Sequence, residues 1–345
     1  MRFKRLIRLL CSMIASFLIL NAVCFFYYNV PVHSESESGS TDYVWEKGKF
    51  YSKGTEGFAF GKTDANGFNN LTTENSLNPE ILVMGSSHTE AFNVAQNESY
   101  VYLLNEMGCN AYNIGISGHR ITTCLNNFER ALDEFKPQKY VVIEVSAAEL
   151  TMDEINQINE GTVNKIHSSA NPILIFLQKI PFVRCVYYQL DKMDFGVKNT
   201  NNAATKTETV KTATKNTIKS DSDDAYNEAL NLLMKKMSSV AEKNGVKIII
   251  LLNPNLNIDE KGNIIPQKIS QKAEMFENAC RNNGIEFLNM YDAFAEMYIE
   301  TYHLPHGFSN TAVGEGHLNK YGHKAIADAL YKFISESEKQ SLVEA

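Results

Sequence analysis

A serine stands where an apolar stretch of the chain passes into a segment with helical spacing. The segment ILVMGSSHTEAF covers residues 81–92, and its apolar run stops at Gly85, just before Ser86 and Ser87. A serine at such a junction could act as a nucleophile, because the positive end of the helix dipole and free backbone N–H groups suit an oxyanion. Ser87 could equally cap the helix, since S-x-x-E is the pattern of a capping box. The segment alone leaves both roles open.

Two further segments carry residues that could act together with such a serine. In AYNIGISGHRITTC, residues 111–124, Gly118 allows close approach of the backbone to a ligand, so its N–H could point at a developing negative charge. A tight turn between strand and helix explains this glycine as well. Near the C-terminus, His317 lies in a glycine-flanked loop and could take a proton from a serine near neutral pH. His323 falls inside the helix that follows, where a packing or surface role is expected.

The elements that must position these residues are indicated by the apolar pattern. Nearly continuous apolar runs alternate with segments of helical spacing, which is typical of a parallel sheet covered by helices on both faces. We predict strands at 81–85, 111–115, 140–145, 246–252 and 285–290. We predict helices near 119–135, 224–243, 268–283 and 320–336. Functional groups of an open parallel sheet gather where its strands end, so the three segments are expected to meet at one edge.

Three short motifs of the chain, in this order, resemble three blocks of the SGNH (GDSL-like) hydrolases. They are GSS-H after a strand, then N-I-G-I-S-G, then G-H-L-N-K-Y-G-H, and the resemblance covers about residues 80–335. This resemblance implies a three-layer α/β/α, flavodoxin-like domain with a central five-stranded parallel sheet in the order 2-1-3-4-5. It also implies that Ser87 is the nucleophile of a serine esterase and His317 its general base. The backbone N–H groups of Ser87 and Gly118 would then bind the oxyanion.

The chain departs from the family pattern at several positions. Ala148 stands where the family's oxyanion asparagine is expected, so one donor is missing or comes from elsewhere, and losing one donor typically costs ~10²-fold in rate. Gly314 replaces the aspartate that should lie three residues before the histidine. Glu315 is the nearest carboxylate and Asp292 a second candidate. Without either acid, a backbone carbonyl could hold the tautomer of His317.

Neighbouring polar residues of the same blocks are candidates for substrate binding. His88 could hydrogen bond the substrate or the loop of Ser87, or it could simply be a polar residue in a first helical turn. Asn319, in the H-L-N motif, is expected to contact substrate. Asp64 and Asn66 are interpreted as loop-forming residues ahead of the first strand of the sheet.

The N-terminus has the composition of a membrane anchor. Four basic residues, Arg2, Lys4, Arg5 and Arg8, precede an apolar run at 9–28, which is about the length needed to cross the ~30 Å hydrocarbon core of a bilayer. Basic residues on the leading flank predict a cytoplasmic N-terminus and an extracytoplasmic remainder. A cleaved signal peptide is the alternative. We divide the chain into a signal anchor at 1–30, a polar tether at 31–45 and a hydrolase-like domain at 46–345, which carries a flexible insertion at about 195–223.

Composition bears on partners and cofactors. The formal net charge is -7 and no basic stripe interleaved with aromatic residues follows the first few residues, which argues against nucleic acid. None of the six cysteines forms a C-x-x-C pair, so the sequence supports neither a metal nor another cofactor. The G-S-S-H form resembles extracytoplasmic proteins that act on acyl groups of surface polysaccharides. It implies an acylated polysaccharide or other ester as substrate, with acyl transfer and a membrane O-acyltransferase partner as further possibilities. A catalytically silent glycan-binding or scaffolding domain is the alternative.

Overall fold

The computed structural model describes residues 2–163, 176–177, 179–192 and 221–344. At its centre lies a parallel sheet of five strands in the order β10-β9-β8-β6-β7. The strands are β6 (Ile81–Met84), β7 (Ala111–Asn113), β8 (Tyr140–Val145), β9 (Lys247–Leu252) and β10 (Glu286–Asn289). In chain order this is 2-1-3-4-5, so the predicted fold class and strand order are confirmed. The strand that leads to Ser87 lies between β7 and β8, as expected.

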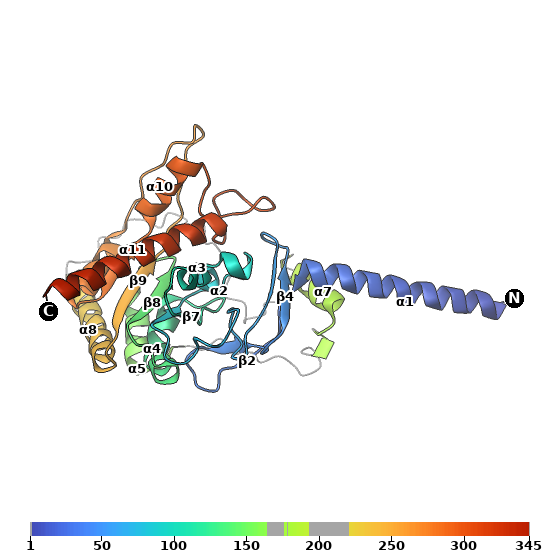
Figure 1. Cartoon of the computed structure of the whole chain (residues 1–345), viewed down its shortest axis with the longest axis horizontal. Coiled ribbons are helices and arrows are strands. Elements are labelled where there is room, and N and C mark those ends of the chain that lie inside the picture. The colour runs from blue at the N-terminus through green and yellow to red at the C-terminus, as the bar shows by residue number, and fades with distance from the viewer. Residues whose placement is uncertain (1, 164–175, 178, 193–220, 345) are drawn as a thin grey trace.

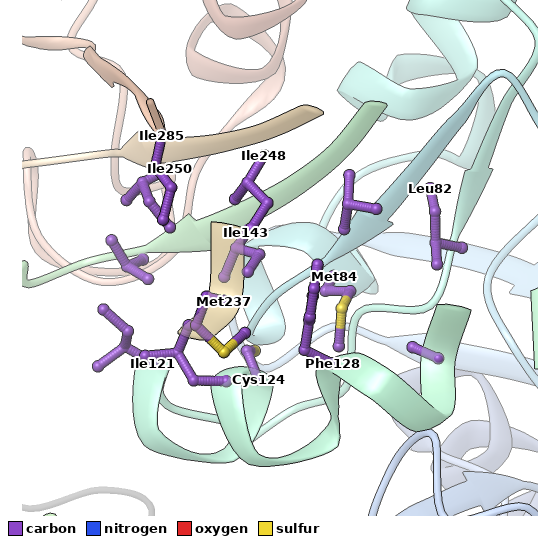
Figure 2. Close-up of a cluster of buried hydrophobic side chains, with 14 of the residues drawn as sticks. Leu82, Met84, Ile121, Cys124, Phe128, Ile143, Met237, Ile248, Ile250 and Ile285 are labelled. Carbon is purple, nitrogen blue, oxygen red and sulfur yellow. The ribbon is translucent and has the colours of Figure 1, made fainter. Parts of the chain in front are cut away.

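Alternate residues of the central strands point to opposite faces, which produces two separate apolar cores. Leu82, Met84, Val141 and Ile143 belong to one core, whereas Ile81, Val83, Tyr140 and Val142 belong to the other. Figure 2 shows part of the first core, where Cys124 and Phe128 of α4 and Met237 of α8 meet Met84 and Ile143 of the sheet. Strands buried on both faces explain why the apolar runs in the sequence are continuous.

The helices fall into two layers, one on each face of the sheet. The first core is closed by α4 (Ile121–Phe135), α5 (Met152–Glu160), α8 (Asp221–Lys243) and α9 (Gln271–Asn282). The second is closed by α3 (Tyr100–Glu106), α10 (Tyr291–Thr301) and α11 (Lys320–Glu344). The three-layer α/β/α arrangement is therefore confirmed (Figure 1). Of the flexible insertion expected at about 195–223, residues 195–220 lie outside the described residues. Residues 221–223 form the start of α8.

Two small antiparallel sheets precede the central one. The first has the order β1-β4-β5, with β1 (Tyr28–Asn29), β4 (Phe50–Lys53) and β5 (Ala59–Lys62). The second pairs β2 (His33–Glu35) with β3 (Tyr43–Trp45). The interpretation of 31–45 as a polar tether is corrected here, because Tyr43 and Trp45 are buried in the first core. The indole N–H of Trp45 donates to the Glu90 carboxylate at 2.7 Å, which ties this segment to the site.

The N-terminal helix α1 (Arg2–Tyr27) projects away from the body of the molecule (Figure 1). Its stretch Phe3–Tyr27 is long and apolar enough to cross a membrane, and nearly all of it is exposed. Helix α7 (Pro181–Lys192) packs along the second half of α1, with Phe182 against Phe17, and its Tyr188 stacks on Tyr28 of β1. The expectation of an N-terminal helix of membrane-spanning length is therefore confirmed.

Candidate active site

Ser87 is the first residue of a short helix, α2 (Ser87–Glu90), that follows directly on β6. The residue that caps this helix is Ser86, whose side chain accepts from the backbone N–H of His88 at 3.3 Å. The capping role considered for Ser87 is therefore wrong. The turn is tight, since a Cβ at Gly85 would lie 2.2 Å from Thr89 Oγ1. The Ser87 hydroxyl is left to interact with other parts of the chain.

His317 reaches Ser87 from the opposite end of the sequence. Its Nε2 lies 2.9 Å from Ser87 Oγ, within the hydrogen-bond range expected for a nucleophile and its base. The histidine lies in the loop before α11, and an isolated bridge between His306 and Leu318 holds that loop together. The structure thus brings together the two residues on which the sequence-based hypothesis depends.

The carboxylate that supports His317 is Glu56, which the sequence analysis missed. Glu56 Oε2 lies 2.5 Å from His317 Nδ1, and Oε1 accepts the backbone N–H of His317 at 2.6 Å. The expectation of Glu315, or of a backbone carbonyl, is corrected accordingly. Glu315 and Asp292 are both exposed, and the Nδ1 side of the ring is occupied by Glu56.

A glycine explains why Glu56 can approach so closely. Gly316 has φ +87°, and a Cβ at this position would lie 2.3 Å from Glu56 Oε1. The glycines that flank His317 were visible in the sequence as loop formers. For Gly316 the structure gives a specific reason, because the Glu56 carboxylate fills the space where a side chain at 316 would stand.

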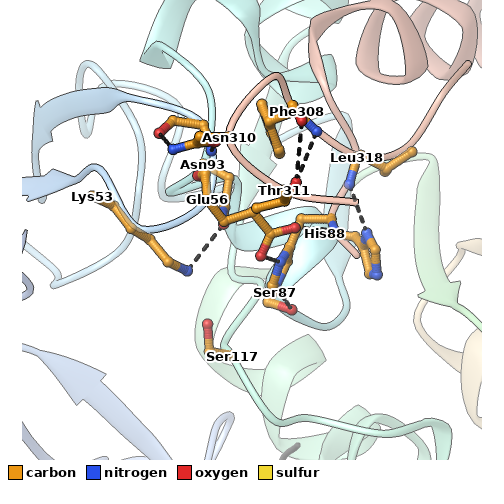
Figure 3. Close-up of polar contacts among 12 residues, drawn as sticks. Lys53, Glu56, Ser87, His88, Asn93, Ser117, Phe308, Asn310, Thr311 and Leu318 are labelled. Carbon is orange, nitrogen blue, oxygen red and sulfur yellow. Dashed lines mark hydrogen bonds and ion pairs between the residues drawn. The ribbon is translucent and has the colours of Figure 1, made fainter. Parts of the chain in front are cut away.

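The turn between β4 and β5 holds Glu56 in place. Asn93, which lies beside Glu56 in Figure 3, donates from Nδ2 to the Glu56 carbonyl at 3.0 Å. Asn310 Oδ1 accepts the N–H of Gly57 at 2.8 Å. Partial burial by itself would raise the pKa of Glu56. The hydrogen bonds and charge of His317, with the charge of Lys53, outweigh it and hold the pKa below the usual 4.5. With a pKa below 4.5, Glu56 is ionised near neutral pH and can stabilise a protonated His317.

A buried glutamate fixes the turn that carries the nucleophile. Glu144, near the carboxyl end of β8, accepts at one oxygen from Ser86 N and Oγ, both at 2.9 Å, and from Thr89 Oγ1 at 3.0 Å. Its other oxygen lies 2.5 Å from Asn253 Nδ2. Burial raises the pKa of Glu144 above its ordinary value. In the sequence its only signal is a lone acid in the apolar run YVVIEV.

A second buried glutamate, Glu90, ties the Gly118 turn to α2. Its carboxylate accepts from Ser117 N at 3.0 Å and from Ser117 Oγ, and burial raises its pKa. Gly118 follows with φ +87°. Within the described residues, the backbone N–H groups of Ser87 and Gly118 have no protein acceptor, as oxyanion donors require. Ala148 is buried and apolar, so its side chain adds no donor.

The other predicted binding residues have structural partners. His88 Nδ1 accepts the N–H of Leu318 at 3.2 Å, so His88 contacts the loop of His317, and burial lowers its pKa well below the usual value. Asn319 is corrected to a structural role. Its Nδ2 donates to Leu304 O at 2.7 Å and to Gly307 O at 3.0 Å, and its Oδ1 accepts the N–H of Tyr321 at 2.9 Å. Both N–H groups of Asn319 Nδ2 are therefore used within the protein, and neither can donate to a substrate.

The remaining residues named from the sequence are accounted for. His323 is buried and stacks on Tyr100, as expected for a packing residue. Asp64 Oδ1 accepts the N–H of Asn66 at 2.8 Å, which confirms both as loop-forming residues. In the part of the chain that the structure describes, no group of three or more His, Cys, Asp or Glu side chains is placed to hold a metal ion.

Among known proteins, only solved structures match the chain. No family model matches the chain, and no curated protein matches it. A GDSL-like lipase from Bacteroides thetaiotaomicron is 12% identical, with 74% of this chain and 88% of that chain covered and a TM-score of 0.32. An acetyl xylan esterase is 14% identical, with 74% and 99% covered and a TM-score of 0.37. A further neighbour is a putative SGNH hydrolase from Slackia heliotrinireducens, which is 13% identical, with 74% of this chain and 98% of that chain covered and a TM-score of 0.35.

Proposed function

We propose that the chain is a serine esterase of the SGNH type that works through an acyl-Ser87 intermediate. The observation that carries this proposal is the chain of contacts from Ser87 Oγ to His317 Nε2, 2.9 Å, and from His317 Nδ1 to Glu56, 2.5 Å. Nucleophile, base and orienting acid in hydrogen-bond contact are the arrangement that recurs in unrelated serine hydrolases.

Each residue has a defined step in this mechanism. Ser87 Oγ attacks the ester carbonyl carbon while its proton passes to His317 Nε2, and the carbonyl oxygen becomes an oxyanion. The backbone N–H groups of Ser87 and Gly118 donate to that oxyanion. When the tetrahedral intermediate collapses, the bond to the leaving alkoxide breaks, and His317 returns the proton to it. Glu56 keeps Nδ1 protonated and stabilises the imidazolium between the two transfers. Water, or a sugar hydroxyl in a transferase, then repeats the sequence on the acyl-enzyme.

The location and substrate of the enzyme form the second part of the proposal. Helix α1 is the right length for an anchor, and its leading basic residues favour a cytoplasmic N-terminus with the domain outside. An acyl ester on an extracytoplasmic glycan fits this location and the G-S-S-H block. A membrane O-acyltransferase would be a natural partner for transfer to or from such a glycan.

Hydrolysis of a small aryl acetate by the full chain in detergent tests the activity. We expect turnover by the native chain and none above background with Ser87→Ala. A folded Ser87→Ala variant that retains full turnover would contradict the proposal. Turnover by neither chain would favour the silent glycan-binding or scaffolding domain, for which Ala148 in place of the family's asparagine is the supporting observation. Release of acetate from O-acetylated envelope polysaccharide, under the same controls, tests the substrate.

A further inference from the structure

The β4–β5 hairpin, which carries Glu56 in its turn, exposes aromatic residues on one face. Phe50, Phe58 and Phe60 are 65%, 64% and 66% exposed. The antiparallel register pairs Ser52 with Phe60 and Phe50 with Lys62, so these four side chains share one face. On the opposite face, Tyr51 and Ala59 are buried against the domain. Three exposed phenylalanines on a short hairpin form an apolar patch of the kind that marks an interaction site.

Helix α1 leaves the domain from this same face. Ser52, which shares the face with Phe60, donates its hydroxyl proton to the carbonyl of Phe25 near the end of α1. The carbonyl of Tyr27 accepts from Gly54 N at 2.8 Å, and Tyr28 of β1 pairs with Lys53 of β4. These contacts fix the hairpin relative to the helix. Whatever surrounds the apolar helix as it leaves the domain therefore lies on the side of the aromatic face.

The basic residues around the patch define the chemistry of its partner. Lys62 Nζ lies 5.8 Å from the centroid of the Phe50 ring, on the exposed face. A cavity of about 330 Å³ between the end of α1 and the hairpin is lined by Phe25, Phe50 and Lys49 and by the ion pair of Lys179 with Glu46, 3.7 Å apart, among others. Aromatic rings beside lysines are suited to the boundary of a bilayer, where rings enter the headgroup layer and ammonium groups meet lipid phosphates.

We propose that the aromatic face of the hairpin, defined by Phe50, Phe58, Phe60 and Lys62, rests on the headgroup layer of the bilayer that α1 spans. This inference rests on the anchor part of the proposed function. It goes further in placing the active site, because Glu56 lies in the turn of the hairpin, two residues before Phe58. The serine, histidine and glutamate would then work directly beside the lipid surface, on esters presented there.

The occupant is a lipid surface rather than a second copy of the chain, because the covering layer must continue around the helix. Nearly all of the stretch Phe3–Tyr27 is exposed, which only a bilayer covers along its whole length. The hairpin stands at the end of that stretch (Figure 1). A protein docked on the hairpin would leave the helix uncovered.

The test measures whether position 60 contacts lipid in the full chain reconstituted in nanodiscs. Phe60→Trp adds an indole to the patch, and Phe58→Trp repeats the test at a second position. Ile299→Trp is the matched control, because Ile299 is 66% exposed and its helix α10 lies far from α1 (Figure 1). The native Trp45 is buried and is common to all three chains. Lipids with a spin label on the headgroup quench an indole that lies in the headgroup layer.

We expect Phe60→Trp and Phe58→Trp to emit at shorter wavelength than Ile299→Trp and to lose more of their emission when spin-labelled lipid replaces plain lipid. Chains that co-elute with nanodiscs but show no more quenching at 58 and 60 than at 299 would overturn the docking surface and leave the anchor intact. Failure to co-elute would overturn the anchor, and the docking surface with it. Neither result depends on esterase activity.

Discussion

At the scale of single residues, the base depends on an acid that is distant in the sequence. Glu56 accepts both the ring Nδ1–H and the backbone N–H of His317, so one carboxylate fixes the tautomer and the position of the loop. The tautomer leaves Nε2 unprotonated toward Ser87, which is the form that can take its proton. Losing this carboxylate should therefore affect chemistry more than substrate binding.

Glu56→Gln should lower kcat by about 10³- to 10⁴-fold, with little change in KM, because the neutral amide favours the wrong tautomer and cannot stabilise the imidazolium. Steady-state kinetics on an aryl acetate measure both constants. Glu315→Gln is the control, because Glu315 is an exposed carboxylate in the loop of His317 that does not contact the ring. Equal loss of kcat in the two variants would show that Glu56 is not the supporting acid.

Glu144 should act through the position of the Ser86–Ser87 turn. Glu144→Ala removes the acceptor of Ser86 N and Ser86 Oγ and leaves the buried Thr89 Oγ1 with Tyr100 Oη as its partner, so the free energy of unfolding should fall by about 2–4 kcal/mol. Glu144→Gln keeps an acceptor for these donors. Its amide can meet Asn253 Oδ1, which is buried with no hydrogen-bond partner, once the Asn253 amide turns over. Urea unfolding should therefore find the glutamine variant close to the native chain.

The raised pKa of Glu144 also predicts how stability changes with pH. The folded chain holds this proton more tightly than the unfolded chain, so the stabilisation is present below the unfolded-state pKa and is lost as pH rises through the folded-state pKa. From mildly acidic to neutral pH, the free energy of unfolding of the native chain should fall relative to that of Glu144→Gln. Parallel curves for the two chains would contradict a raised pKa.

The sequence predicted some of these residues and could not have predicted others. Ser87 and His317 stand in short local patterns, a strand end and a glycine-flanked loop, so their types and neighbours indicated their roles. Glu56 is one of many acids and lies in a turn with no motif, and its contact with His317 spans 261 positions. Asn319 was misinterpreted because an H-L-N motif does not show whether the amide faces the substrate or its own loop.

At the scale of elements, a loop and a hairpin meet to form the acid–base pair. Gly314 and Gly316 both have φ near +80°, at +80° and +87°, so an alanine at either position strains the backbone by about 1–2 kcal/mol. Only at 316 would the new Cβ collide with the Glu56 carboxylate, at 2.3 Å, whereas at 314 it meets Leu304 Cδ1 at 3.0 Å. The two glycines therefore form a matched pair.

Gly316→Ala should lower kcat strongly, because Glu56 must move away from His317, whereas Gly314→Ala should lose stability with little change in kcat. Thermal unfolding and steady-state kinetics on the same preparations separate the two effects. If kcat falls equally in both variants, strain in the loop rather than displacement of Glu56 controls the base.

Elements were predictable where burial was continuous. The five strands of the central sheet lie in nearly continuous apolar runs, and the helices α4, α8, α9 and α11 have apolar residues at helical spacing. Both patterns identify the type of element from the sequence. The strands of the two small sheets, with sequences such as HSE and FYSK, mix polar with apolar residues, so no continuous apolar run marks them. Their stability comes from distant partners such as Glu90, which binds Trp45. The interpretation of 31–45 as a tether failed for this reason.

At the scale of the whole molecule, the chain combines an α/β/α domain with one exposed apolar helix. If α1 is an uncleaved anchor, the full-length chain should fractionate with membranes, resist extraction by salt and carbonate, and be released at full length by detergent. Protease added outside the cell should reach the domain. A soluble extracellular form that begins after the apolar run would show instead that the segment is a cleaved signal peptide.

The central claim is that Ser87 is a nucleophile activated by His317 and Glu56. Its most direct test is reaction of the full chain in detergent with a fluorophosphonate, followed by peptide mapping of the adduct. We predict a single adduct on Ser87, absent from Ser87→Ala, formed much more slowly by His317→Ala and Glu56→Gln, and formed at the native rate by Glu315→Gln. A folded chain that forms no adduct, or forms it on another serine, would contradict the account.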